Sequence, residues 1–296
     1  MADFLLWMLY DQKDYLVNQD FGALVTREAR RRRMDVRIVL TEDLTLGVDE
    51  NGAPTLLLCG QPAALPDATL SRQRNAFFSR QLEKMGVWVL NDSHICEICN
   101  DKRKTHLFLS GRDIPMMETT FLSSSGTQAP QSGYPYLLKP AGGHGGDRVA
   151  LARNEEEWRA AAASILPQDL LCQAVASDAG KDLRVYVLFG QIVAAVLRTA
   201  KSGYISNYKR GGDVALYPLS PSERAAAQRV IDVFASCGME LCMAGVDFLF
   251  DRGRLVLSEV EDVVGSRMLY KVSDFNLVGL YLDEVRVRLT ARIRTV

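Results

Sequence analysis

The stretch GVDFLFDRGRLVLSEVE, residues 245–261, decides the fold because it encodes two apolar β-strands joined by a short turn that contains Gly253. Alternation along a strand puts Glu259 and Glu261 on one face, with Asp247 at the same end of the hairpin. Carboxylates that converge repel one another and are costly to bury without a cation. Mg²⁺ prefers such oxygen ligands and binds one or two carboxylates together with nucleotide phosphate. The hairpin alone leaves two interpretations open, a magnesium site or a solvated rim.

A glycine-rich segment upstream offers a matching phosphate site. The apolar strand Tyr136–Pro140 carries Lys139 and leads into AGGHGGDRV, residues 141–149. Its glycines allow close approach of the backbone to a ligand, and their amides can hold phosphate oxygens. The chain resumes a strand at Val149, so the segment predicts a strand–flap–strand hairpin and not a Walker A loop, which would lead into a helix. Taken alone, the segment is also compatible with an ordinary turn.

Composition indicates an ordinary globular protein without a polyanionic partner. The 296 residues are 48% hydrophobic and 24% charged, with a formal net charge of -1. This balance argues against a nucleic-acid or membrane binder driven by electrostatics, and no run approaches the roughly 18 apolar residues of a membrane span. The apolar start, residues 1–10, is flanked by Asp3 and Asp11 and predicts a strand instead of a signal peptide. We expect a cytoplasmic protein and leave a homo-oligomer open.

The six cysteines fit a reducing compartment. Cys96 and Cys99 form a CxxC pair, but no second Cys or His pair follows at zinc spacing. A redox protein built on this pair is therefore a minor alternative.

The first ninety residues predict a small α/β domain with a largely parallel sheet. The expected elements are strands at Phe4–Tyr10, Val36–Leu40, Thr55–Leu58 and Val87–Leu90, and helices over 18–33 and 71–85. No G-x-G-x-x-G lies in this region, so no nucleotide is assigned to it.

Five motifs in a fixed order resemble the ATP-grasp superfamily, most closely its RimK-type ligases, which attach glutamate or other amino acids to a carboxylate. The motifs are the lysine before the glycine segment, GKDLR (180–184), SNYKRGG (206–212), GVD (245–247) and EVE (259–261). The resemblance covers about residues 91–279 and implies an α/β (α+β) ATP-grasp fold, in which two α+β subdomains grip ATP. It divides the chain into a pre-ATP-grasp domain (1–90), a central subdomain (91–172) and a C-terminal subdomain (173–296).

The resemblance also implies roles for individual residues. The nucleotide residues would be Lys102 and Lys139, the flap Gly142, Gly143, His144, Gly145 and Gly146, and the adenine neighbours Gln173 and Val175. Arg184, Arg198, Asn207 and Arg210 would hold the acyl-phosphate and γ-phosphate, and Asp247, Glu259 and Glu261 would bind magnesium.

Two departures from the family pattern concern the metal hairpin and its neighbour. Relatives usually carry Glu-x-Asn where this chain has Glu259 and Glu261, which keeps an oxygen ligand and adds a negative charge. Residues 263–267, VVGSR, replace a Ser-Pro-Gly segment that usually borders the acceptor site. The identity of the substrate is therefore left open by the sequence.

The implied function is an ADP-forming ligase that joins a carboxylate to an amine through an acyl-phosphate. ATP would act with about two Mg²⁺ ions, or with Mn²⁺ in their place. The amine or carboxylate would come from a glutamate-like amino acid, a small peptide or a protein tail. Two alternatives remain besides the redox protein, namely an ATP-grasp phosphotransferase without ligation and a nucleotide-binding module without turnover.

Overall fold

The computed structural model describes residues 2–123, 133–143, 148–165, 168–201 and 212–293, and the chain forms two compact units. Unit 1 comprises residues 1–97, 239–243 and 274–296, and unit 2 comprises residues 98–238 and 244–273. Within the described ranges, every helix is too short or too polar to span a bilayer.

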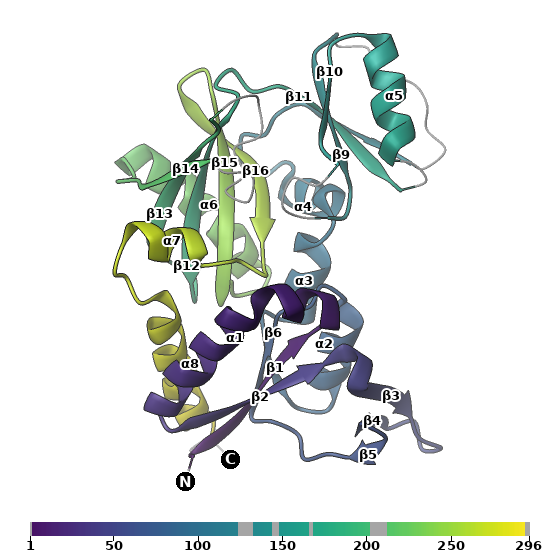
Figure 1. Ribbon diagram of the computed structural model, residues 1–296, viewed down its shortest axis with the longest axis vertical. Helices are drawn as coiled ribbons and strands as arrows, with labels where there is room; N and C mark the ends of the chain where they lie inside the picture. Colours follow the sequence, from purple (N-terminus) through teal and green to yellow (C-terminus); the bar gives the residue numbers. More distant parts are fainter. Residues whose placement is uncertain (1, 124–132, 144–147, 166–167, 202–211, 294–296) are drawn as a thin grey trace. The chain divides into compact units, whose positions relative to one another are not determined.

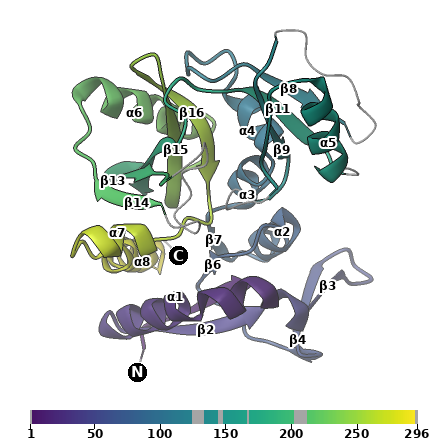
Figure 2. The same ribbon diagram turned by 45° about the horizontal axis from the view of Figure 1, so that its top comes forward.

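Unit 1 is built on a parallel sheet with the strand order β2-β1-β6-β7. Its elements are β1 (Phe4–Tyr10), α1 (Gln12–Arg31), β2 (Met34–Leu40), the 3-10 helix Thr41–Asp43, β3 (Leu44–Val48), β4 (Pro54–Leu58), β5 (Gln61–Pro62), β6 (Ala68–Ser71), α2 (Ala76–Lys84), β7 (Trp88–Leu90) and α8 (Leu277–Ile293). The run Leu6–Tyr10 is buried throughout, as expected of a central strand covered on both faces. Figure 2 shows α1 lying along β2. The predicted parallel α/β opening is confirmed.

The predicted helix over 71–85 begins later than expected. Ser71 is the last residue of β6, and the helix starts only after Asn75, whose side-chain oxygen accepts a hydrogen bond from the amide of Phe77 at 3.0 Å. This N-cap fixes the start of α2, because it satisfies an amide that has no partner within the helix.

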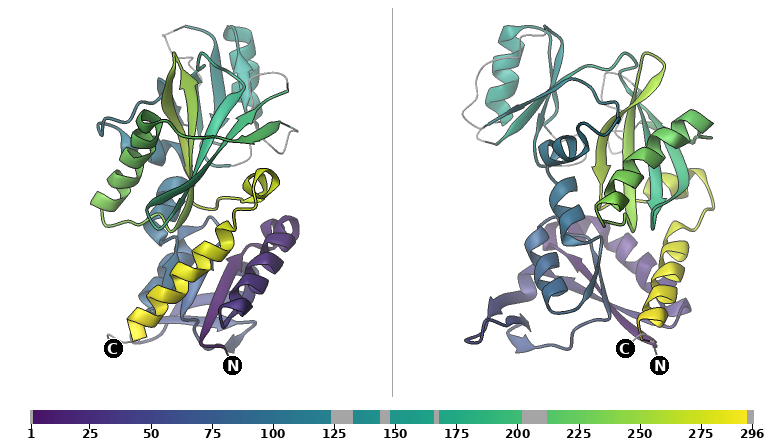
Figure 3. Two further views of the ribbon diagram at one scale, coloured as in Figure 1. Left: turned by 90° about the vertical axis from the view of Figure 1, so that its left-hand side faces the viewer. Right: turned by 180° about the vertical axis from the view of Figure 1, so that it is seen from behind.

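The C-terminal helix α8 belongs to unit 1. The division predicted from the sequence instead assigns it to the C-terminal subdomain, residues 173–296. The Arg32 guanidinium at the end of α1 donates to both oxygens of Asp283 at 2.7 and 2.9 Å, and Asn276 Nδ2 donates to Glu28 Oε2 at 3.1 Å. Figure 3 shows α8, in yellow, running beside α1, in purple. The division into three domains stays a prediction. The two compact units have other boundaries, at residues 97/98, 238/239, 243/244 and 273/274.

Unit 2 contains two antiparallel sheets, with strand orders β10-β9-β11-β8 and β14-β13-β12-β15-β16. Helix α3 (Ser93–Cys99) contains the boundary, because residues up to 97 belong to unit 1 and unit 2 begins at residue 98. The other elements of unit 2 are α4 (Lys102–Leu109), β8 (Thr119–Leu122), β9 (Tyr136–Pro140), β10 (Ala150–Ala152), α5 (Glu155–Ile165), β11 (Leu170–Ala174), β12 (Lys181–Leu188), β13 (Gln191–Thr199), β14 (Asp213–Leu216), α6 (Pro221–Ser236), β15 (Met243–Asp251), β16 (Arg254–Glu261) and α7 (Arg267–Val272).

One helix covers each sheet of unit 2. Trp158 and Ile165 of α5 are buried against Leu138 and Leu170 of the smaller sheet, and Figure 1 shows α5 along that sheet. Helix α6 lies on the larger sheet in the right-hand view of Figure 3. It begins with a capping box, in which the Ser220 hydroxyl accepts from the Glu223 amide at 3.3 Å and the Glu223 carboxylate accepts from the Ser220 amide at 2.8 Å.

The strand order of the larger sheet places the site residues. Strands β15 and β16 form the predicted hairpin, with Asp247 opposite Glu259 and Gly245 opposite Glu261. Strand β12 lies between β13 and β15, so Arg184 of β12 has Arg198 on one neighbouring strand and Asp247 on the other. Three charged side chains far apart in sequence are thereby held on adjacent strands.

Candidate active site

Lys102 is positioned by the start of α4. The Asp101 side chain caps this helix by accepting from the Arg103 amide at 2.9 Å. From the first turn, Lys102 Nζ donates to the Gly143 carbonyl at 2.7 Å and lies 3.7 Å from Glu259 Oε2. One ammonium group thus links the glycine segment to the acidic hairpin.

The described part of the flap is anchored to the same helix. The Lys102 amide donates to the Ala141 carbonyl at 2.9 Å, and Gly142 and Gly143 are both exposed. Gly143 has φ of +109°, a left-handed conformation that side chains other than glycine rarely adopt. The remaining flap residues of the prediction, His144, Gly145 and Gly146, lie outside the described residues.

Lys139 faces Gln173 across neighbouring strands of the smaller sheet. Lys139 is paired with Leu171 and Gln173 with Leu137, so the two side chains are diagonal neighbours on one face. Lys139 Nζ donates to Gln173 Oε1 at 2.8 Å. Burial lowers the pKa of Lys139 to about 8, with the nearby Lys102 ammonium acting in the same direction and the Glu259 carboxylate opposing it. Val175 follows directly after β11 and is half-buried.

Asp247 lies at the centre of a buried ion cluster. Arg184 Nε and Nη2 donate to its two oxygens at 2.7 and 2.6 Å, and Arg198 Nη2 donates to Oδ2 at 2.6 Å. Arg184 Nη1 also lies 2.6 Å from Glu261 Oε2, and Arg198 pairs with Asp182. The side chains of Asp247, Arg184 and Arg198 are only 2%, 8% and 9% exposed.

The charges of this cluster are mutually stabilised. Burial opposes the ionisation of Asp247, but Arg184 and Arg198 outweigh it and lower the pKa of Asp247 to about 2. Burial likewise opposes the charge of Arg184, while Asp247 and Glu261 raise its pKa well above the usual value. The cluster therefore stays ionised at neutral pH.

Gly245 makes room for this arrangement. A Cβ at this position would lie 2.8 Å from Val264 Cγ2 and 3.3 Å from Arg184 Cδ. A side chain there would displace Val264 and crowd the side chain of Arg184, so the glycine of the GVD motif has a packing role.

The predicted magnesium ligands are not gathered as a ready-made metal site. Among the residues that the structure describes, no group of at least three His, Cys, Asp or Glu side chains could hold a metal ion. Both oxygens of Asp247 are committed to arginines, whereas Glu259 is 33% exposed and Glu261 25% exposed. Two carboxylates with phosphate oxygens match the usual coordination of Mg²⁺. The donor set therefore fits Mg²⁺ through Glu259 and Glu261, whereas the charge of Asp247 is already neutralised by two arginines.

The structure describes two of the four arginine and asparagine residues predicted to bind phosphate. Arg184 and Arg198 lie close together, and both form an ion pair with Asp247 instead of lining an open anion site. Asn207 and Arg210 lie outside the described residues. Sequence reasoning assigned no role to Asp182 or His106, although Asp182 lies inside the GKDLR motif and His106 lies one helical turn after Lys102.

Residues 99–284 match the sequence model of the RimK-like ATP-grasp domain. The probable alpha-L-glutamate ligase of Aliivibrio fischeri (strain MJ11) is 32% identical over 230 residues, which cover 73% of this chain and 73% of that protein. VanG D-Ala:D-Ser ligase of Enterococcus faecalis superposes with a TM-score of 0.74 at 14% identity, over 96% of this chain and 98% of that one. The ATP-grasp ligase PsnB, solved with minimal precursor, Mg and ADP, gives a TM-score of 0.67 at 15% identity, over 97% of this chain and 98% of that one. The structural likenesses concern the fold, while the sequence matches extend to the family level.

Proposed function

The chain belongs to the RimK-like ATP-grasp family, and from that premise we propose which residues carry the reaction and which substrates it joins. The protein is an ADP-forming ligase that uses ATP to join a carboxylate to an amine. The comparisons support ligation over phosphoryl transfer alone and over nucleotide binding without turnover. Proteins of this family use ATP with Mg²⁺, and PsnB was solved with Mg and ADP.

The reaction proceeds in two steps in this proposal. The substrate carboxylate attacks the γ-phosphorus of ATP and ADP leaves. The amine then attacks the acyl carbon of the acyl-phosphate, and phosphate is expelled from the tetrahedral intermediate. Such phosphoryl transfer needs positioning and charge neutralisation more than a covalent catalyst.

One observation carries the assignment of the ATP site, namely that the Lys102 ammonium contacts both the glycine segment and a carboxylate of the acidic hairpin. Lys102 Nζ donates to the Gly143 carbonyl at 2.7 Å and lies 3.7 Å from Glu259 Oε2. A triphosphate carried by Mg²⁺ requires this combination of cationic donors and a metal-binding carboxylate.

The remaining roles follow from this centre. Lys102 and Lys139 bind the phosphates, Gly142 and Gly143 form the described base of the flap, and Gln173 with Val175 borders the adenine. Glu259 and Glu261 would hold Mg²⁺, about two ions in all or Mn²⁺ in their place, which supplies charge neutralisation of the phosphates. Arg184 and Arg198 orient Asp247 and lie beside the acyl-phosphate position.

We propose a glutamate-like amino acid as one substrate. The proposal is supported by the 32% identity to a protein named probable alpha-L-glutamate ligase. The second substrate is a carboxylate or amine of a small molecule, a peptide or a protein tail. A cytoplasmic location is supported by the cysteines, all six of which are free thiols.

Hydroxylamine trapping tests the reaction. With Mg-ATP, L-glutamate and a panel of carboxylates, we expect ADP release that depends on the carboxylate substrate. Hydroxylamine added in place of the amine should yield a hydroxamate, because it attacks an acyl-phosphate. A mixture without carboxylate provides the background. Stable phosphorylated product with no hydroxamate would contradict ligation.

The pH dependence of kcat/KM for ATP tests the role of Lys139. Because the pKa of Lys139 is lowered to about 8, its ammonium is lost as pH rises through that value, and kcat/KM should fall above about pH 8. Below this pH the lysine is charged and the profile should be level with respect to this group. Lys139→Arg keeps its charge throughout and serves as the control, in which the alkaline decline should disappear. A wild-type profile that stays level to about pH 10 would contradict the assignment.

A further inference from the structure

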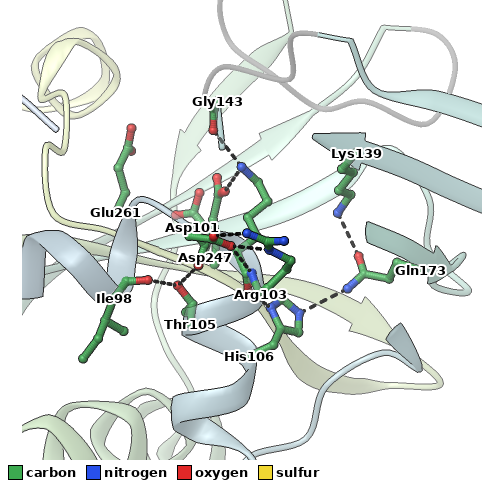
Figure 4. Close-up of polar contacts among 12 residues, drawn as sticks. Ile98, Asp101, Arg103, Thr105, His106, Lys139, Gly143, Gln173, Asp247 and Glu261 are labelled. Atoms are coloured by element: carbon green, nitrogen blue, oxygen red, sulfur yellow. Dashed lines mark hydrogen bonds and ion pairs between the residues drawn. The ribbon is translucent and has the colours of Figure 1, made fainter. Parts of the chain in front are cut away.

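A chain of hydrogen bonds connects two main-chain carbonyls to the ammonium group of Lys139. It passes through His106 on α4, Thr119 on β8 and Gln173 on β11, and Figure 4 shows the Lys139–Gln173–His106 part. His106 is 5% exposed and Gln173 1% exposed, so neither side chain can exchange these partners for bulk water.

The first carbonyl fixes the tautomer of His106. Its Nδ1 lies 2.8 Å from the carbonyl oxygen of Lys102, and a carbonyl can only accept, so Nδ1 carries the proton. Burial lowers the pKa of His106, as do the ammonium groups of Lys139 and Lys102, while the hydrogen bond to the Lys102 carbonyl and the charge of Glu259 act against this. The neutral ring therefore presents Nε2 as an acceptor.

The second carbonyl fixes the amide of Gln173. The Thr119 hydroxyl donates to the Met117 carbonyl at 2.9 Å, which leaves its oxygen as an acceptor. Gln173 Nε2 lies 3.0 Å from Thr119 Oγ1 and 3.3 Å from His106 Nε2. With two acceptors on this side, the NH₂ group must face them, and Oε1 must face Lys139, which donates to it at 2.8 Å.

We propose that His106 is a positioning residue of the nucleotide site, which orients the Gln173 carbonyl oxygen so that it holds the Lys139 ammonium in place for phosphate. The inference rests on the proposed role of Lys139 in binding ATP. Without an acceptor at Nε2, one of the two acceptors that orient the Gln173 amide is lost, so the amide rotates more readily. When it rotates, its NH₂ group faces Lys139 and removes the oxygen that holds the ammonium.

Two substitutions separate positioning from packing, because each keeps one of the two contacts. His106→Gln places a side-chain oxygen near the former Nε2 and keeps the acceptor for Gln173. His106→Asn places its NH₂ near the former Nδ1 and keeps the donor to Lys102, but removes that acceptor. The loss of that acceptor is measured as a change in affinity for Mg-ATP, in which each tenfold corresponds to about 1.4 kcal/mol.

The Kd for Mg-ATP, the KM for ATP and kcat are measured for both variants, with unfolding in urea as the measure of stability. We expect His106→Asn to raise the Kd and KM about tenfold with kcat within about threefold, and His106→Gln to stay near wild type. Equal losses of affinity in both variants, or none in His106→Asn, would overturn the inference. Lys139→Met serves as the reference, because unchanged ATP binding in that variant would refute the proposed function and not the positioning role.

Nitrogen-15 NMR of the histidine rings provides a readout that packing alone would not move. The His106 signal is assigned by its loss in His106→Gln. We expect a protonated Nδ1 and an unprotonated Nε2 at neutral pH. The opposite tautomer, or a doubly protonated ring, would overturn the inference whatever the kinetics.

Discussion

Lys139→Met is expected to reduce ADP formation by about a hundredfold to a thousandfold, which is the usual cost of removing one preorganised donor from a charged transition state. The Lys139 side chain is half-buried and donates to Gln173. Burial lowers its pKa to about 8, so the charged form is less favoured than in an exposed lysine. Methionine keeps most of the length of the side chain and removes only the charge and the donor. The measurement is ADP release under saturating carboxylate, together with the Kd for Mg-ATP.

The fold should survive this change. The substitution removes the desolvation cost of a partly buried cation. Among the described residues, Gln173 Oε1 loses its hydrogen bond from Lys139, which destabilises the fold by about 1–3 kcal/mol. Lys84→Met, an exposed lysine in the last turn of α2, is the matched control and should leave activity unchanged. Turnover of Lys139→Met within about tenfold of wild type would exclude Lys139 from the phosphate site.

Asp247→Asn is expected to lower the free energy of unfolding by about 3–5 kcal/mol, because it leaves two buried arginines with one anion fewer. Arg184 and Arg198 both donate to the Asp247 carboxylate, and both are less than one-tenth exposed. Glu261 and Asp182 remain as partial partners, so the variant should still fold. Urea unfolding at neutral pH measures the loss.

The same variant has a characteristic pH dependence. The pKa of Asp247 is lowered to about 2 in the folded protein, against about 3.9 in an unfolded chain, so its stabilising contribution is fully present above about pH 4 and is lost as pH falls through about 2. The stability difference between wild type and Asp247→Asn should therefore narrow over this interval. Asp232→Asn, on the exposed face of α6, is the control and should change stability by less than about 0.5 kcal/mol. A small loss in Asp247→Asn at neutral pH would show that the ion cluster contributes little.

The ion cluster also bears on the proposed magnesium site of the acidic hairpin. Asp247, Glu259 and Glu261 all come from β15 and β16, yet the first is neutralised by arginines while Glu259 is the most exposed of the three. Extra negative charge at Glu261 is partly offset by Arg184 Nη1 at 2.6 Å. Glu261, which the resemblance sets in place of an expected asparagine, therefore lies beside a guanidinium that compensates its charge.

Much of the local structure could be predicted from the sequence. The apolar run Phe4–Tyr10 and the hairpin over 245–261 were both expected, and each forms in the structure. Their signals are local, because residue alternation, turn residues and caps are fixed within about ten positions of the chain. At Ser71 the local signal is ambiguous, because the sequence predicts the start of a helix at a residue that ends β6.

The type and order of the charged residues were also determined by the sequence, and they predict that the lysines, the glycine segment and the acidic hairpin are parts of one ATP site. Only the tertiary structure decided which charge meets which. Arg184, Arg198 and Asp247 become partners because β12 lies between β13 and β15, and His106 reaches Gln173 because α4 lies near β11. Such pairings depend on contacts between strands and helices that are distant along the chain, and no periodicity within a segment records them.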